Sequence, residues 1–129
     1  MGDLVRRFYE DLWNRWDDDA VDVLLSENLA FRGSLATQTR GRSQWRSYRD
    51  GVRRGAPDFH NDVVTVVTDG IHAAARLVYT GTHTGDLAGL SATGRRFCYA
   101  GAAFFTADAG QLTSAWVLGD LHALHQQLG

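Results

Sequence analysis

Two side chains that exchange protons near neutral pH stand close to the ends of expected strands. His83 lies in the run Thr80-Gly81-Thr82-His83-Thr84-Gly85, and Asp120 ends the run Trp116-Val117-Leu118-Gly119-Asp120. Imidazole and carboxylate groups are the usual general acids and bases at this pH. The combination predicts a small acid/base enzyme, with Asp120 and His83 as its candidate catalytic residues.

Strand alternation places these groups relative to their neighbours. Trp116 and Asp120 share one face of the last expected strand. We expect that face to line a pocket, with Trp116 in its wall and Asp120 inside; the alternative is a solvated carboxylate at the strand end. Tyr79 and His83 alternate together on an earlier strand. His83 either hydrogen-bonds a substrate oxygen or holds the following loop through a backbone carbonyl.

Aromatic and imidazole side chains supply the expected substrate-binding residues. Most aromatic residues pack in cores, but four Trp in 129 residues leave some for a pocket wall. His60 follows Pro57-Asp58-Phe59 at a strand start. It is either a site residue or a histidine that packs or lies at the entrance of the pocket. The predicted substrate-binding set is Trp116, Tyr79, His60, Trp45 and Phe104.

No metal or cofactor site is predicted. His122 and His125 have a spacing that suits one helical face, but no third ligand accompanies them. The glycines Gly85, Gly89 and Gly94 lack the spacing of a phosphate-binding loop and precede a strand, so they are interpreted as loop hinges.

Composition limits the class of protein. The chain has 129 residues, 44% of them hydrophobic, which fits a single globular domain over 1–129. A net charge of −2 gives no basic field for nucleic acid or an anionic membrane. All 13 basic residues are Arg, and the lack of Lys excludes Schiff-base chemistry.

Cysteine content and hydropathy suggest a cytoplasmic location. Cys98 is the single cysteine, so no disulfide can form within the chain, and its apolar surroundings predict a buried thiol. The N-terminal residues do not resemble a signal peptide, and no apolar run is long enough to span a membrane.

Hydrophobic periodicity predicts helices first and strands afterwards. Helical spacing indicates helices over 2–16 and 43–52, with a short one after Asp17-Asp18-Asp19. Alternation indicates a short strand at 28–33 and longer strands at 59–67, 71–83, 95–106 and 111–121, with a frayed tail at 122–129. This order predicts an α+β fold in which helices cover the concave face of a curved antiparallel sheet around a central pocket.

Four sequence blocks carry a resemblance to a known family. They are Pro57-Asp58-Phe59-His60, the run from Thr80 to Gly85, the stretch from Gly89-Leu90 to Arg95-Arg96, and the spacing from Trp116 to Asp120. With the order of elements, they make the chain resemble the SnoaL-like polyketide cyclases and ester cyclases of the nuclear transport factor 2-like superfamily. That resemblance implies a cone of curved sheet closed by three N-terminal helices.

The resemblance also implies a reaction. In SnoaL-like cyclases an aspartate on the last strand is the general acid/base for an aldol-type ring closure, and Asp120 matches its position. The implied function is a cofactor-free cyclase in secondary metabolism, acting on a small hydrophobic poly-oxygenated molecule of polyketide type. The chain departs from the family pattern at Ser114-Ala115, at Gly119 and at Phe104-Phe105.

Two other functions and one assembly stay open at this point. Epoxide-hydrolase-like chemistry in the same pocket would need an Asp-Arg-Asp relay, for which Asp120, Arg76 and either Asp62 or Asp86 are candidates. The third possibility is a non-catalytic small-molecule-binding module. Relatives commonly pair through the convex face of the sheet, so a homodimer is expected, with small residues at the contact: Ala73, Ala75, Ala100 and Ala102.

Overall fold

A computed structural model describes residues 1–129 and shows one curved sheet with helices on its concave side. The strand order is β2-β1-β6-β5-β4-β3, and only β1 and β6 run parallel. The strands are β1 (Leu25–Arg32), β2 (Gln38–Arg40), β3 (His60–Asp69), β4 (His72–Thr82), β5 (Arg96–Asp108) and β6 (Gln111–Gly119). The predicted α+β architecture is confirmed.

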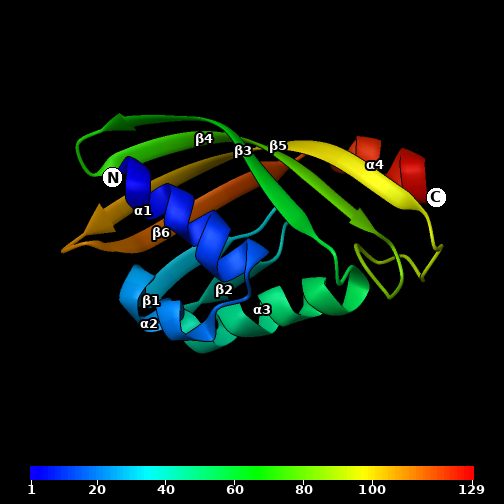
Figure 1. Ribbon diagram of the computed structural model, residues 1–129, viewed down its shortest axis with the longest axis horizontal. Coiled ribbons are helices and arrows are strands. Elements are labelled where there is room, and N and C mark those ends of the chain that lie inside the picture. Colours follow the sequence, from blue (N-terminus) through cyan, green and yellow to red (C-terminus); the bar gives the residue numbers. More distant parts are fainter.

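Helical segments close the concave side into a cone. In Figure 1, α1, α2 and α3 lie beneath the sheet, and α4 lies where β5 begins and β6 ends. The segments are α1 (Gly2–Arg7), the π-helix η1 (Phe8–Asn14), the 3₁₀-helix η2 (Asp18–Ala20), α2 (Val21–Leu24), α3 (Gly41–Gly55) and α4 (Leu121–Leu128).

The N-terminal helix is fixed to the sheet by two asparagines. The Asn14 side chain donates to the carbonyl of Asn61 at 2.9 Å and accepts from the Asn61 amide at 2.8 Å. Asn14 thereby satisfies the backbone of β3 as a neighbouring strand would. The contact holds η1 over the concave face, so that Tyr9 and Trp13 are buried inside the cone.

Side chains alternate cleanly across the sheet. Tyr79, Tyr99 and Phe105 point inward and are buried, as part of one cluster of 30 buried hydrophobic residues. Phe104 and Trp116, on the opposite face, are 53% and 45% exposed. The concave face is therefore the core of the protein, and the convex face keeps exposed aromatic side chains.

Glycines on the inner surface make room for the largest rings. A Cβ at Gly101 would lie 2.5 Å from Cε2 of Tyr79, and one at Gly119 would lie 3.0 Å from Cε2 of Tyr99. A Cβ at Gly33 would overlap the Tyr48 ring. Because real Cβ atoms do not approach other atoms this closely, these positions require glycine while the tyrosines keep their places.

The predicted C-terminal tail is wrong, because residues 121–128 form α4. Asp120 caps this helix by accepting a hydrogen bond from the Ala123 amide at 3.1 Å. Leu124 and Leu128 are buried in the core, and that burial holds the short helix in place.

Three smaller expectations are also wrong. The polar stretch before α3 contains the edge strand β2, which pairs with β1. Cys98 is exposed, because it faces outward from β5 between two buried aromatic residues. Ala73 and Ala75 point inward and are buried, so of the small residues expected on the convex face only Ala100 and Ala102 lie there.

Candidate functional site

The cone encloses one small cavity between η1, α3 and the concave face of the sheet. Its volume is about 20 Å³, which is enough for one water molecule. Eleven residues line it: Phe8, Tyr9, Trp13, Phe31, Ser34, Tyr48, Val52, Phe59, Asn61, Tyr79 and Val117. None is an acid or a histidine, so the titratable groups at this site are phenols.

The tyrosines at the cavity differ in their hydrogen bonds. The hydroxyls of Tyr9 and Tyr79 are buried and have no partner within the protein. Tyr99, next to Tyr79 with ring centroids 4.8 Å apart, shares a hydrogen bond of 2.9 Å with Ser34. Tyr48 accepts a long bond, 3.4 Å, from the Leu35 amide. Two phenolic groups are thus free to bind a ligand.

Burial keeps these tyrosines protonated. It raises the pKa of Tyr9, Tyr79 and Tyr99 far above the ordinary phenol value, and it raises the pKa of Tyr48 to about 12. At neutral pH each is therefore a hydrogen-bond donor and not a base. Two such donors in a largely apolar cavity can stabilise negative charge that develops on an oxygen.

The structure brings one predicted site residue, Tyr79, to the cavity. Trp45 is fully buried but packs behind the lining, with its ring 5.9 Å from Phe8 and 5.8 Å from Trp13. His60 and Phe104 are exposed on other parts of the surface. These three residues do not line the cavity.

The expectation that Trp116 and Asp120 face the interior is wrong. By alternation they share a face with Leu118, and that face is the convex one: Trp116 and Leu118 are about half exposed. The inward phase of β6 is taken by Ala115 and Val117, which are buried. The strand ends at Gly119, and Asp120 is exposed and occupied as the cap of α4.

His83 is fully buried, and both of its ring nitrogens bind the loop between β4 and β5. Nδ1 accepts from the Thr93 amide at 3.2 Å, so Nε2 carries the proton and donates to the Leu90 carbonyl at 3.1 Å. His83 does not line the cavity. Its position matches the second of the two predicted roles, that of holding the loop.

Three of the four sequence blocks behind the family resemblance contact one another. The Asp58 carboxylate accepts from both the amide and the hydroxyl of Thr82, each at 2.7 Å. His83, beside Thr82, binds Thr93 of the third block. These blocks therefore join the start of β3 to the end of β4 and to the loop that follows.

The Asp-Arg-Asp relay is not assembled. Arg76 points outward from β4 and is exposed, as are Asp62, Asp86 and Asp120. None of the four lines the interior cavity. The geometry gives no support to epoxide-hydrolase-like chemistry there.

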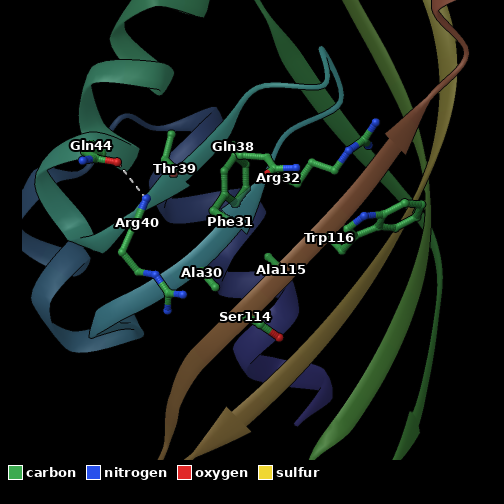
Figure 2. Close-up of a pocket in the computed structure, with 10 residues that line it drawn as sticks. All are labelled: Ala30, Phe31, Arg32, Gln38, Thr39, Arg40, Gln44, Ser114, Ala115 and Trp116. Atoms are coloured by element: carbon green, nitrogen blue, oxygen red, sulfur yellow. Dashed lines mark hydrogen bonds between the residues drawn. The ribbon is translucent and has the colours of Figure 1, made fainter.

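The convex side carries a wider and more open groove, of about 460 Å³, beside the edge strand β2 (Figure 2). The Arg32 guanidinium lies over the Trp116 ring at 5.0 Å from its centroid, and Arg32 donates to the carbonyl of Val117. Arg40 donates through its amide to Gln44 at 2.9 Å. The polar groups that line this groove are largely engaged with the protein itself.

The sequence does not single out Tyr9, Ser34 and Tyr48, which line the cavity, or Tyr99, which lies beside Tyr79. Tyr9 and Tyr48 lie on apolar helix faces, where an aromatic residue usually belongs to the core. Tyr99 stands directly opposite Tyr79 in the sheet. This pairing is the signal that could have indicated Tyr99, but finding it requires the strand register, which the sequence does not give.

A curved sheet closed by helices around an aromatic cavity defines the nuclear transport factor 2-like class of folds, as expected. The chain belongs to the SnoaL-like polyketide cyclase family, whose model matches residues 3–128. Family membership supports a cyclase-type role of the protein, with a small molecule as its substrate. Comparison with curated proteins gives no match.

Solved structures share this fold. TsrD from Streptomyces laurentii is 26% identical, with a TM-score of 0.87 over 99% of this chain and 93% of its own. A protein of Jannaschia sp. CCS1, described as a SnoaL-like polyketide cyclase, superposes with a TM-score of 0.89 at 19% identity over 98% and 90% of the two chains. IdmH from Streptomyces antibioticus, described as a polyketide cyclase, superposes with a TM-score of 0.85 at 23% sequence identity, over 99% of this chain and 97% of its own.

No helix of the structure has the length and apolar character needed to cross a membrane.

Buried tyrosines make stability sensitive to alkali. The folded-state pKa values are raised above the unfolded value of about 10, so only the unfolded state loses these protons as pH rises above about 10. We expect the free energy of unfolding to fall there by about 1.4 kcal/mol per pH unit for each such tyrosine. Phenolate absorbance should rise together with loss of circular dichroism. Ionisation of all four tyrosines near pH 10 in the folded protein would contradict the proposed burial.

Replacement of His83 tests its role in the loop. We expect His83→Ala to lower the free energy of unfolding by about 2–4 kcal/mol and to speed hydrogen exchange in residues 84–94, because two buried hydrogen bonds and a packed ring are lost. His83→Asn keeps an acceptor for the Thr93 amide and should protect the loop in part. An Asn variant with a protected loop but no turnover would instead show that the imidazole takes part in the chemistry.

Proposed function

We propose that this protein is a cofactor-free cyclase that closes a ring in a small polyketide-type molecule inside the cone, where the substrate displaces part of the aromatic lining of the cavity of about 20 Å³. The observation that carries the proposal is the pair of buried hydroxyls of Tyr9 and Tyr79, which have no partner within the protein. An unpaired buried polar group costs about 1–3 kcal/mol. A substrate oxygen that accepts from these hydroxyls would offset that cost, so the pair fits a ligand with carbonyl oxygens.

The proposed chemistry needs charge stabilisation more than a strong base. In a linear polyketone, a carbon between two carbonyls loses its proton readily to water, and the resulting enolate carbon attacks another carbonyl carbon. One carbon–carbon bond forms, and the new alkoxide takes a proton from water. Tyr9 and Tyr79 would donate to the enolate and alkoxide oxygens, where negative charge develops. The aromatic walls would hold the chain folded, which favours the intramolecular attack.

This proposal moves the chemistry away from Asp120. For Asp120 to act as general acid/base, its carboxylate would have to leave the Ala123 amide and reach the opposite face of the sheet. The proposal therefore gives Asp120 a structural role at the start of α4, and it gives His83 the role of positioning the loop.

A second candidate is a small-molecule-binding module without turnover. It is favoured by the lack of a carboxylate or imidazole among the cavity-lining residues. Both candidates place the ligand at the same hydroxyls, and they differ only in whether bound polyketone is converted to a ring.

Phenylalanine variants separate catalysis from packing. The assay uses a synthetic linear triketone, nonane-2,4,8-trione, in which the carbon between the first two carbonyls attacks the third and closes a six-membered ring. The product, 2-acetyl-3-methylcyclohex-2-enone, forms with loss of one water and is followed by mass spectrometry. We expect Tyr79→Phe to slow closure by about 10²–10³-fold, the usual effect of removing one oxyanion donor. The same variant should be as stable as the wild type or more so, because an unpaired hydroxyl is removed.

Two controls accompany this experiment. Tyr99→Phe removes a hydroxyl that is already bonded to Ser34, so it should cost about 1 kcal/mol of stability with a smaller effect on rate. Asp120→Asn should change neither the stability nor the rate of ring closure, because Asn caps a helix as well as Asp does. Wild-type protein that binds the triketone without closing it would support the binding module. Loss of turnover in Asp120→Asn alone would restore the carboxylate mechanism.

We propose in addition that two copies pair through the convex face. Phe104, Trp116 and Leu118 are 53%, 45% and 52% exposed there, and the rings of Phe104 and Trp116 lie 6.0 Å apart. Exposed aromatic groups beside an arginine such as Arg32 are typical of protein interfaces.

A charge placed in this patch tests the pairing. Across a two-fold axis a residue near the centre meets its own copy, so Leu118→Glu should convert a dimer to a monomer in analytical ultracentrifugation. Val23→Glu is the matched control, because Val23 is 57% exposed but lies on α2, away from the convex face. A wild-type monomer, or a dimer that survives Leu118→Glu, would contradict the proposed interface.

A further inference from the structure

A further hollow lies outside the cavity, between α3 and the loop that joins β4 to β5. We call it the mouth groove; Leu35, Tyr48, Gly51, Val52 and Leu87 are among the residues that line it. Its volume is about 210 Å³. In Figure 1 the loop between β4 and β5 reaches the C-terminal end of α3, and the groove lies where these two segments meet.

The mouth groove and the interior cavity share two lining residues, Tyr48 and Val52. Tyr48 is partly exposed, whereas Tyr9, Tyr79 and Tyr99 are each 2% exposed. Its hydroxyl accepts a long hydrogen bond, 3.4 Å, from the Leu35 amide. Of the four tyrosines, Tyr48 is therefore the one whose side chain stands between the two spaces and also reaches the surface.

The loop side of the groove is fixed. The amides of Thr84 and Gly85 both donate to the carbonyl of Gly55 at 3.0 Å, and Leu87 is buried against Gly55. His83 holds the rest of the loop through Leu90 and Thr93. Movement that connects the two spaces is thus expected from the Tyr48 side chain and not from the loop.

We infer that the mouth groove and the cavity form one binding site, with the Tyr48 ring as the partition that a ligand displaces. The inference takes the chemistry at Tyr9 and Tyr79 from the proposed function. The route into the cavity and the size of the ligand do not depend on it. The ligand is a molecule of one or two fused rings that carries oxygen at the end facing the cavity. Its other end lies in the groove.

Size and polarity define this ligand class. The mouth groove is smaller than the usual range for small-molecule sites, about 300–1,000 Å³, and the cavity adds little until Tyr48 moves. A turned Tyr48 ring releases the space of one phenol. The groove rim carries Thr37, Ser47 and Asp86, which suit a neutral hydroxylated tail better than an anionic one. Molecules of three or more fused rings do not fit.

Gly51 allows the route to be blocked without disturbing the fold. It lies within α3 and lines the groove, and an added Cβ would meet only Nη2 of Arg54, at 3.7 Å. Leu favours a helix interior over Gly, so Gly51→Leu should fold with at least wild-type stability. Ser43→Leu, at an exposed position of the same helix outside the groove, is the matched control.

The test is isothermal titration calorimetry with 1-naphthol as the two-ring probe and 1-hydroxyanthraquinone as the three-ring probe. We expect the wild type and Ser43→Leu to bind 1-naphthol with equal affinity, Gly51→Leu to bind it at least tenfold more weakly, and the wild type to exclude the three-ring probe. Tyr48→Ala should admit both probes, because the partition is gone.

Three results would overturn the inference: no binding of 1-naphthol by the wild type, unchanged affinity in Gly51→Leu, or equal affinity of the wild type for both probes. Each is measured without turnover. A protein that binds 1-naphthol through the groove but closes no triketone would keep the inference and reject the proposed cyclase activity.

Discussion

The close approach of tyrosine rings to glycines on the concave face is the constraint on which the interior depends. Tyr79 lies against Gly101, Tyr99 against Gly119 and Tyr48 against Gly33. A side chain at any of these glycines would push a ring into the cavity, and protein interiors have little free volume to absorb such a shift. The size of the cavity and the positions of its hydroxyls follow from this packing.

That packing also decides the chemistry the interior can offer. Burial keeps the phenols inside the cone protonated, so they supply hydrogen-bond donors and no base. Such a site suits a substrate whose carbon acid ionises easily and whose oxygens need stabilisation. The carboxylates and most histidines of the chain lie outside, where they cap helices or meet solvent.

Element types and their order could be predicted from the sequence, because hydrophobic period reports local structure. The strands around Tyr79 and Tyr99 and the helix around Tyr48 follow from period alone. The short strand β2 was missed since three polar residues on a sheet edge carry no alternation to detect. Helix α4 was missed because its stability comes from Leu124 and Leu128 packing in the core, which the sequence does not show.

The sequence by itself determined the family, the α+β fold and the sharing of one strand face by Trp116 and Leu118. The tertiary structure alone decided which face is inside. Alternation has period two and is symmetric under exchange of the faces, so it cannot tell concave from convex. The side on which helices pack breaks that symmetry. It places Trp116 and Asp120 outside and gathers tyrosines from η1, α3 and β4 around one cavity, with Tyr99 of β5 beside Tyr79.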